Sequence, residues 1–378
     1  MRTGITDTSE FSAKNCARVY QLHHSIPGYT STPLQRLRGL AHRLGVGEIW
    51  VKDESSRFGL NAFKALGASY AIAVQILGGE EELHFDKVQA RVTDDSHSNI
   101  IFVTATDGNH GRAVAWISEL LGVLCVVYMP HGSEQIRIDA IRAHGAQVEV
   151  LAGSYDDAVN HAATQAIKYS WTLLQDTAWE NYTSIPLNIM QGYSTLLTET
   201  FGQLNGQIPT HVFLQAGVGS MAASVQAILI EHYGAGAPKV IIVEPLAADC
   251  YFTSMSVADG NLHSIDGHLA TSMAGLACGT PSLLAWPILR DHSTCFIKCD
   301  DEITESGMRI LASPTDGDSI IVSGESGAVT TGLLAELMSN PDQRELADSL
   351  SLGPGSKILL ISTEGDTDPS NYRRIVKK

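Results

Sequence analysis

Short apolar segments alternate with amphipathic stretches through most of the chain. The segments with the character of buried strands are residues 48–52, 100–105, 123–129, 147–151, 172–175, 211–215, 239–243 and 357–362. The stretches with helical periodicity are residues 65–77, 111–121, 133–143, 155–169 and 222–232. Strands separated by helices of ten or more residues predict parallel βαβ units. The pattern therefore predicts an α/β fold.

Two stretches interrupt this alternation. Residues 80–97 are polar and aperiodic, which predicts an exposed loop. Residues 202–209 contain Gly206 and Pro209 and predict a crossing between domains. The chain shows no internal repeat and no low-complexity linker.

Length and charge narrow the class of protein. With 378 residues the chain is long enough for two domains that share a cleft. Its formal charge of −16 argues against nucleic acid or an anionic membrane as a partner. No run approaches 18 apolar residues, and the first residues lack the apolar core of a secretory signal. We expect a cytoplasmic protein.

The six cysteines do not form a disulfide framework over this length, so reduced thiols are expected. Cys295 and Cys299 are not followed by a second ligand pair, so the spacing predicts no zinc site and no other metal site. Cys250 and Cys278 both lie in loop-like sequence, and a regulatory disulfide between them stays open.

Lys64 stands between a strand and a small-residue helical stretch. Its neighbours Phe63 and Ala65 are apolar, which predicts a partly desolvated ammonium with a lowered pKa. Schiff-base chemistry needs such a lysine, because only the neutral amine attacks a carbonyl. For a lone lysine the alternative is an ordinary solvated side chain at a helix start.

Two further loops follow strands and precede helices, the usual place for ligands in open α/β sheets. Residues 217–221 contain Gly217 and Gly219, which allow backbone amides to face a phosphate at a helix start. Ser220 can add a hydroxyl donor. In the other loop, Asp107 can bind an ammonium or accept a proton, with a helix cap as the alternative.

Several motifs together resemble the tryptophan-synthase-β-like (fold type II) pyridoxal-phosphate enzymes, and within them the diaminopropionate ammonia-lyases. The segments that carry the resemblance are residues 51–70, 104–111, 175–180 and 362–369, and it extends over residues 32–369. The resemblance implies two open, mostly parallel twisted sheets with helices on both faces and pyridoxal 5′-phosphate in the interdomain cleft. It also implies a larger cofactor domain of residues 1–66 and 201–378, a smaller mobile domain of residues 67–200, and a homodimer.

The resemblance also assigns roles to individual residues. Lys64 and Asp107 would be catalytic, as two bases on opposite faces of the substrate. The expected cofactor-binding residues are Phe63, Lys64, Asn109, Gly217, Val218, Gly219, Ser220, Met221, Glu325 and Ser362. The expected substrate-binding residues are Thr106, Asp107, Gly108, His110 and Asp176. For Asp176 a helix cap or a structural ion pair is the alternative.

The reaction implied is elimination of ammonia from 2,3-diaminopropionate, giving pyruvate and two ammonia. Asp107 and Asp176 together favour an amine over a hydroxyl as the leaving group. Two other interpretations keep the fold: a serine, threonine or hydroxyaspartate dehydratase, and a β-replacement synthase. An interpretation of another class is a catalytically silent pyridoxal-phosphate-binding protein.

Overall fold

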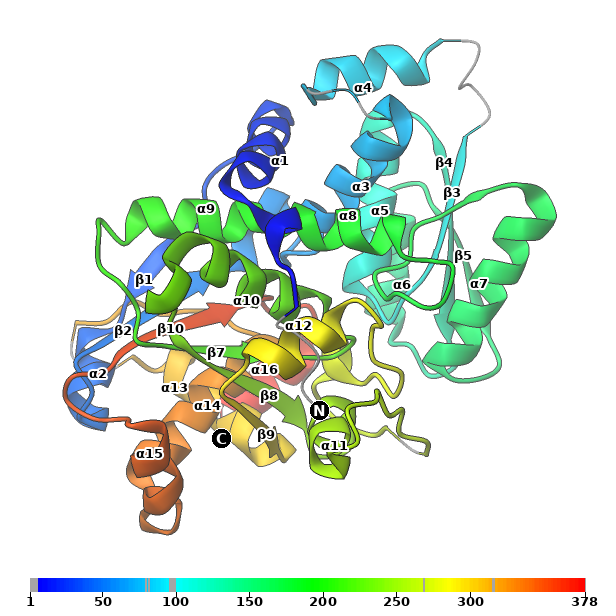
Figure 1. Cartoon of the computed structure of the whole chain (residues 1–378). Helices are drawn as coiled ribbons and strands as arrows, with labels where there is room; N and C mark the ends of the chain where they lie inside the picture. Colours follow the sequence, from blue (N-terminus) through cyan, green and yellow to red (C-terminus); the bar gives the residue numbers. More distant parts are fainter. Residues whose placement is uncertain are drawn as a thin grey trace.

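The computed structural model of the chain describes residues 6–78, 80, 82–94, 100–267, 269–314 and 317–377. Within these ranges ten strands form two sheets, and helices pack on both faces of each sheet (Figure 1). The predicted α/β fold with two mostly parallel sheets is confirmed. All six cysteines are free thiols, and the buried Cys250 and Cys278 are not linked.

The strands divide between the sheets by their place in the sequence. They are β1 (Leu34–Arg36), β2 (Glu48–Asp53), β3 (Ile101–Ala105), β4 (Leu124–Pro130), β5 (Gln147–Leu151), β6 (Thr172–Leu173), β7 (His211–Gln215), β8 (Lys239–Pro245), β9 (Cys295–Cys299) and β10 (Lys357–Ser362). The larger sheet has the order β1-β2-β10-β7-β8-β9, and the smaller has the order β5-β4-β3-β6. All described strand pairs are parallel except β1 with β2.

Sixteen α-helices connect and cover these strands in the described residues. They are α1 (Ala13–Ser25), α2 (Arg38–Leu44), α3 (Ala65–Leu77), α4 (Phe85–Val92), α5 (Asn109–Leu121), α6 (Gln135–Arg142), α7 (Tyr155–Tyr169), α8 (Ser184–Gly192), α9 (Ser194–Gln203), α10 (Ser220–Tyr233), α11 (Cys250–Val257), α12 (Ala285–His292), α13 (Asp301–Ala312), α14 (Glu325–Ser339), α15 (Arg344–Leu350) and α16 (Pro369–Val376). None of the described helices is both long and apolar enough to cross a bilayer.

The larger sheet is buried on both faces, as its apolar strands require. Along β10, Ile358 and Leu360 belong to one hydrophobic cluster, with α13, α14 and α15. Leu359 and Ile361 point the other way, into the cluster that contains residues of α3, α8 and α10. Successive side chains of a strand alternate between faces, so a continuous apolar run fits a central strand.

The smaller sheet has the same three-layer arrangement. Val103 and Ala105 of β3 pack with Ala158 and Ala162 of α7 on one face. Phe102 points to the opposite face, into the cluster that includes α5. Both sheets are therefore covered by helices, and their strand ends are left to carry chemistry (Figure 1).

The prediction of an exposed loop over residues 80–97 is wrong in its middle, where α4 forms (residues 95–99 lie outside the described part of the chain). Phe85, Val88 and Val92 are all buried, at spacings of three and four residues. This is the helical period, but three apolar residues among many charges gave too weak a signal. The helix is thus a local amphipathic one held by a single apolar stripe.

Candidate active site

The backbone around Lys64 is tied to the end of β10. Ala62 forms an isolated antiparallel bridge with Glu364, and the Phe63 amide donates to the Thr363 carbonyl at 3.1 Å. Lys64 follows at the start of α3. These pairings place the lysine beside the carboxyl ends of the larger sheet's strands, although 299 residues separate positions 64 and 363.

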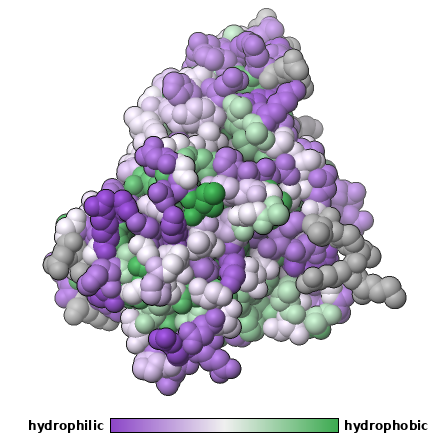
Figure 2. Space-filling model, turned by 60° about the vertical axis from the view of Figure 1, so that its left-hand side comes forward, coloured by the Kyte–Doolittle hydropathy of each residue, from purple (hydrophilic) through white to green (hydrophobic). Residues whose placement is uncertain are grey.

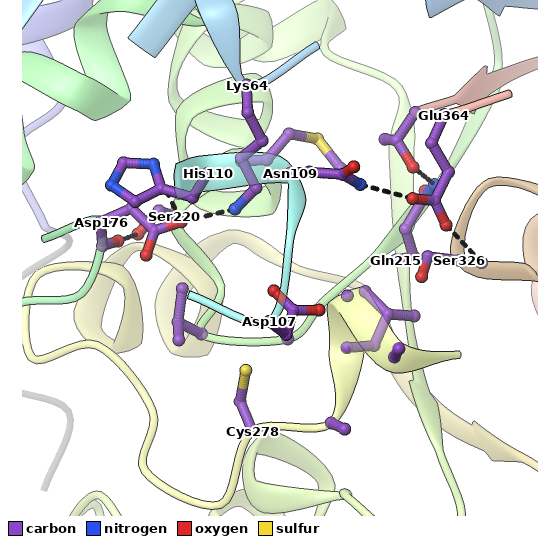
Figure 3. A pocket seen from close by; sticks show the side chains of 18 of the residues that line it. Lys64, Asp107, Asn109, His110, Asp176, Gln215, Ser220, Cys278, Ser326 and Glu364 are labelled. Atoms are coloured by element: carbon purple, nitrogen blue, oxygen red, sulfur yellow. Dashed lines mark hydrogen bonds and ion pairs between the residues drawn. The ribbon is translucent and has the colours of Figure 1, made fainter. Parts of the chain in front are cut away.

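A cavity opens at this point, between the carboxyl ends of strands from both sheets. The space not filled by protein atoms amounts to about 750 Å3, which includes open solvent at the entrance. The residues that line it are Phe63, Lys64, Thr106, Asp107, Asn109, His110, Tyr155, Asp176, Gln215, Gly217, Val218, Gly219, Ser220, Met221, Ala222, Ala274, Gly275, Leu276, Ala277, Cys278, Ser326, Thr363 and Glu364. Figure 3 shows Lys64 and Asp107 entering it from opposite sides.

Lys64 forms an ion pair with Asp176 inside the cavity. Lys64 Nζ lies 2.5 Å from Asp176 Oδ2, and the side chains are 18% and 4% exposed. Burial disfavours the charged lysine, but the Asp176 carboxylate outweighs burial and raises the pKa of Lys64. The structure therefore does not agree with the predicted lowering of this pKa, because the prediction did not include the Asp176 carboxylate. The same pairing, against the effect of burial, lowers the pKa of Asp176 to about 2.

His110 is a buried neutral acceptor beside this pair. Its Nε2 lies 2.7 Å from the Leu174 carbonyl, which can only accept, so Nε2 carries the proton. Burial lowers the pKa of His110. Its Nδ1 lies 3.9 Å from Asp176 Oδ2 and has no hydrogen-bond partner among the described residues. Two acceptors thus lie next to each other at this point, and the Lys64 ammonium donates to one of them, Asp176.

The loop before α5 is shaped by Thr106 rather than by Asp107. The Thr106 hydroxyl accepts from the amides of Gly108 and Gly111 at 2.9 and 3.0 Å. Gly111 is the third residue of α5, so it is the Thr106 hydroxyl that caps this helix. In the described residues no helix amide donates to the Asp107 carboxylate, so the cap interpretation of Asp107 is wrong, and the carboxylate faces the cavity (Figure 3). Burial raises the pKa of Asp107, although the charges of Arg137 and Lys64 oppose that effect.

Asn109 is held by a carboxylate that the sequence analysis did not single out. Its Nδ2 donates to Glu364 Oε2 at 2.5 Å, and Glu364 Oε1 accepts from the Ser326 amide at 3.1 Å (Figure 3). Glu364 is buried and belongs to the segment after β10. This chain of hydrogen bonds fixes the Asn109 side chain against the cavity wall.

The glycine loop before α10 forms a cradle of backbone amides. Gly219 has φ of 88°, and a Cβ on it would overlap the ring and hydroxyl of Tyr251. A Cβ on Gly217 would lie 2.9 Å from the Gly275 carbonyl oxygen. No side chain caps α10, so its first amides remain directed at the cavity. The Ser220 hydroxyl, expected to face a phosphate, donates instead to the Asp176 carbonyl at 2.5 Å.

These residues fit pyridoxal phosphate in three respects. The cavity holds a lysine amine, and it holds an anion cradle at a helix start. Its lining also includes two buried polar atoms, Gln215 Oε1 and Ser326 Oγ, that have no hydrogen-bond partner among the described residues. A buried polar atom without a partner costs about 1–3 kcal/mol, so a polar ring with an oxygen and a nitrogen would satisfy this wall.

Two residues expected at the cofactor lie behind the wall. The Ser362 hydroxyl donates to Ser323 Oγ at 2.8 Å, and the cavity is lined by the next residue, Thr363. Glu325 bonds Asn371 and lines a groove outside the cavity, while its neighbour Ser326 lines the cavity itself. In both cases the next residue in the chain lines the cavity.

Several cavity residues were not predicted from the sequence as cofactor-binding, substrate-binding or catalytic residues. They are Tyr155, Gln215, Cys278, Ser326, Thr363 and Glu364. Gln215 and Thr363 could have been found, because they end or follow predicted parallel strands. Cys278 lies in the irregular segment after α11, for which the pattern gives no placement.

Comparison with known proteins agrees with this geometry. A family profile described as "Pyridoxal-phosphate dependent enzyme" matches residues 26–363. Diaminopropionate ammonia-lyase of Salmonella typhimurium is 49% identical over 366 residues, which are 95% of this chain and 91% of that protein. The chain belongs to the diaminopropionate ammonia-lyase family.

Solved structures of this ammonia-lyase family have the same fold. The holo enzyme of Escherichia coli, a selenomethionine form, superimposes with a TM-score of 0.91 at 44% identity, covering 99% of this chain and 93% of that one. A second crystal structure of that enzyme, in complex with an aminoacrylate-PLP azomethine reaction intermediate, gives a TM-score of 0.88 at 44% identity, covering 99% and 94%. The family's dependence on pyridoxal phosphate fits the lysine, the cradle and the polar wall described above.

Proposed function

We propose that the protein converts 2,3-diaminopropionate and water into pyruvate and two ammonia, with pyridoxal 5′-phosphate as cofactor. The observation that carries the proposal is the pair of carboxylates in the cavity, Asp107 and Asp176, with Lys64 between them (Figure 3). A substrate with two ammonium groups complements this arrangement. Membership of the ammonia-lyase family supports the same reaction.

The residues proposed to hold the cofactor are Lys64, Phe63, Asn109, Thr363, Ser326 and the backbone of residues 217–221. Lys64 supplies the amine, and the amides at the start of α10 take the phosphate. When bound, the cofactor withdraws electrons from the substrate Cα, which makes the Cα proton removable. Ser362 and Glu325 support this wall from behind.

Asp176 has two successive partners in this proposal. In the structure it pairs with the Lys64 ammonium, at 2.5 Å. Once Lys64 holds the cofactor it no longer carries the ammonium charge, so Asp176 can pair with an ammonium of the substrate instead. The Lys64 amine that the substrate amine replaces is released neutral and can accept the Cα proton.

The leaving group is selected because neither Asp176 nor His110 Nδ1 can donate a proton to it. Asp176 is ionised, with a pKa of about 2, and His110 presents the bare Nδ1. Both accept hydrogen bonds and neither donates a proton. An ammonium leaves as neutral ammonia without any further acid, whereas a hydroxyl needs one. The site therefore favours diaminopropionate over serine or threonine.

Substrate orientation and stereochemistry follow from the loop before α5. The amides of Gly108 and Gly111 are bound to Thr106, so we assign the α-carboxylate to the amides of residues 107, 109 and 110. Lys64 and Asp107 enter the cavity from opposite sides, so each can accept the Cα proton of one substrate enantiomer. Loss of ammonia then yields aminoacrylate, which hydrolyses to pyruvate and the second ammonia.

The proposal is tested with both enantiomers of diaminopropionate. Pyruvate and ammonia are measured from the purified, cofactor-loaded protein, and two ammonia per pyruvate are expected. We expect kcat/KM at least about tenfold above that for serine, or about 1.4 kcal/mol of transition-state stabilisation. Equal or greater activity with serine or threonine would instead assign a dehydratase. A protein that binds the cofactor without turnover of any of these substrates would be a silent binding protein.

We also propose a larger domain of residues 1–66 and 201–378, with residues 67–200 as a smaller mobile domain. The strands of the smaller sheet all lie within residues 101–173, which supports this division.

We propose a cytoplasmic homodimer; the free thiols support a reducing compartment. Leu246, Met255 and Val257, in and beside α11, are 55%, 37% and 51% exposed and support a subunit contact there. Light scattering during gel filtration tests for twice the 40.6 kDa chain mass.

A further inference from the structure

Arg137 reaches the proposed active site from α6, a short helix on the outside of the smaller domain. Its stem packs on the loop before α5, where a Cβ on Gly108 would lie 3.2 Å from Arg137 Cδ. Arg137 Nη1 lies 3.4 Å from the Asp107 carbonyl oxygen and 3.7 Å from Asp107 Oδ2. The glycine therefore leaves room for an arginine that holds both ends of Asp107.

The packing of α6 does not account for this guanidinium. Ile138 and Ile141 bury the helix against the core, while Arg137, 15% exposed, lines the groove outside the cavity, which Asp107 also lines. Its Nε is buried without a hydrogen-bond partner in the described residues. Among the described residues, Asp107 has the one carboxylate that lies within 4 Å of the Arg137 guanidinium. The charge of Arg137 also acts on Glu325 and Asp368 across the groove, but the carboxylate in direct contact with it is that of Asp107.

We propose that Arg137 is the positioning residue of Asp107, holding its carboxylate ionised and aimed into the cavity for the enantiomer whose Cα proton faces it. The inference rests on the proposed function, which assigns the proton-accepting role to Asp107. Arg137 does not touch the substrate in this role. It acts on one enantiomer only, because Lys64 serves the other from the opposite side.

The charges around Asp107 support a role for Arg137. Burial raises the pKa of Asp107, and Arg137 is the strongest of the charges that lower it, ahead of Lys64. Glu364, beyond β10, acts in the opposite direction. The other titratable groups whose charges couple to Asp107 are His110 of α5, Tyr155 of α7 and Cys278. Among these neighbours only Arg137 and Lys64 are cations, and Lys64 must lose its charge to act.

The test measures kcat against pH for each enantiomer in Arg137→Gln, Arg137→Lys and the parent enzyme. For the Asp107-dependent enantiomer, kcat should fall at low pH as Asp107 becomes protonated, and this fall is the acid limb of the profile. Arg137→Gln should move the limb to a pH about one unit higher, so that kcat at pH values on the limb is about tenfold lower than in the parent enzyme. The alkaline plateau and the other enantiomer should change less than about twofold. Arg137→Lys keeps the charge and should restore most of the limb.

Arg142→Gln is the matched control, because Arg142 lies on the same helix, is 50% exposed and pairs only loosely with Asp139, at 3.9 Å. It should leave both profiles unchanged. A loss in Arg137→Gln that is equal for both enantiomers at every pH would mean a structural role and would overturn the inference. An unmoved acid limb would overturn it as well.

A second measurement separates this inference from the proposed function. If the parent enzyme turns over neither enantiomer, the proposed function fails by itself. Carboxyl 13C NMR of aspartate-labelled protein, with the Asp107 signal assigned from its loss in Asp107→Asn, then follows the ionisation of Asp107 without turnover. Arg137→Gln should titrate about one pH unit higher, and an unchanged titration would refute the role of Arg137.

Discussion

Lys64 has to be an ammonium when Asp176 is its partner and a neutral amine when it reacts. Beside Asp176 the ammonium form is favoured, because the nearby carboxylate outweighs the effect of burial. In the proposed chemistry the neutral amine is the one released when the substrate amine takes the place of Lys64 on the cofactor.

Replacing Lys64 with alanine should abolish turnover and covalent attachment of the cofactor, because no other lysine reaches the cavity in the described structure. Borohydride reduction followed by peptide mapping identifies the attached lysine. Lys52 is the control: it is fully buried, and its ammonium is already bound by Glu199, Thr32 and Gln203. A label on Lys52 would overturn the assignment.

Asp107→Asn should lower kcat about 100-fold for one enantiomer of diaminopropionate, because an amide cannot accept the Cα proton. The other enantiomer, which depends on Lys64, should lose far less. The fold should be unaffected, since Asp107 caps no helix. Separate steady-state kinetics with each enantiomer measure this, and near-parent turnover of both would rule out the catalytic role.

The sequence predicted the loops of the site more securely than the residues that face inward. Residues on successive positions of a strand end point to opposite sides, so Ser362 and Thr363 cannot both line the cavity. Which of them does so depends on the register of β10 in the sheet, and local sequence does not contain that register. Glu325 and Ser326 begin α14, where successive side chains are rotated by about 100°, so which of them faces the cavity depends on how the helix packs.

At the scale of elements, buried ion pairs fasten the segment that leads to Lys64. Glu199 of α9 lies 2.7 Å from both Arg57 Nη1 and Lys52 Nζ, and Arg57 Nε lies 2.8 Å from Glu54 Oε2. All four side chains are at most 1% exposed. Together they join β2, the 3-10 segment η2 (Glu54–Gly59) and α9.

Glu199→Gln should destabilise the fold by about 3 kcal/mol, because removal of one partner leaves buried charges uncompensated. Chemical denaturation of the cofactor-free protein measures the free energy of unfolding. Glu48→Gln is the control, since Glu48 pairs with the 44% exposed Arg36 at the surface and should cost less than about 1 kcal/mol. Equal effects of the two substitutions would contradict the argument.

Gly219→Ala should weaken cofactor binding by about 100-fold, or roughly 2.7 kcal/mol. The added Cβ would overlap Tyr251 at a backbone φ of 88°, so the amide cradle has to shift. Fluorescence titration with pyridoxal phosphate measures the affinity without turnover. Gly236→Ala, where the Cβ meets no described atom within 4 Å, should bind as the parent does. Unchanged affinity in Gly219→Ala would remove the loop from the phosphate site.

Long apolar elements were the easiest to predict. The bounds of β5, β7, β10, α3 and α7 agree with the periodicity of the sequence. The strands β1 and β9 were not predicted. β1 has only three residues, none of them buried, and β9 contains a lysine and two cysteines, so both resemble loops in sequence. Their pairing partners, rather than their own residues, make them strands.

At the scale of the whole molecule, we expect His23 to make the free energy of unfolding fall in acid. This histidine is fully buried, with Nε2 2.9 Å from the Leu66 carbonyl and Nδ1 2.6 Å from the Thr195 hydroxyl. Burial lowers the pKa of His23 from 6.5 to about 3. Between these values the unfolded chain binds a proton that the folded chain excludes, so stability falls as pH drops from 6.5 toward 3.

His23→Gln should therefore flatten the decline of unfolding free energy between pH 6.5 and 4, by a few kcal/mol over the window. Urea denaturation at several pH values compares the slope with that of the parent. His24→Gln, an exposed neighbour on α1, should leave the slope unchanged. A slope in His23→Gln equal to that of the parent would assign the acid sensitivity to carboxylates instead. The face in Figure 2 is mostly hydrophilic, so solubility should allow these titrations.

The position of β10 in the larger sheet sets a condition on biosynthesis. It is the last described strand in the sequence, yet it lies between β2 and β7 in the middle of the sheet. On the ribosome, β2 and β7 emerge with a gap one strand wide between them, and each keeps an unpaired edge until residues 357–362 have been made. Glu364, which fixes Asn109, emerges after that strand. A nascent chain can therefore neither close its larger sheet nor complete its cofactor pocket before residues 357–364 have been made, and until then the two open strand edges are available for wrong pairing.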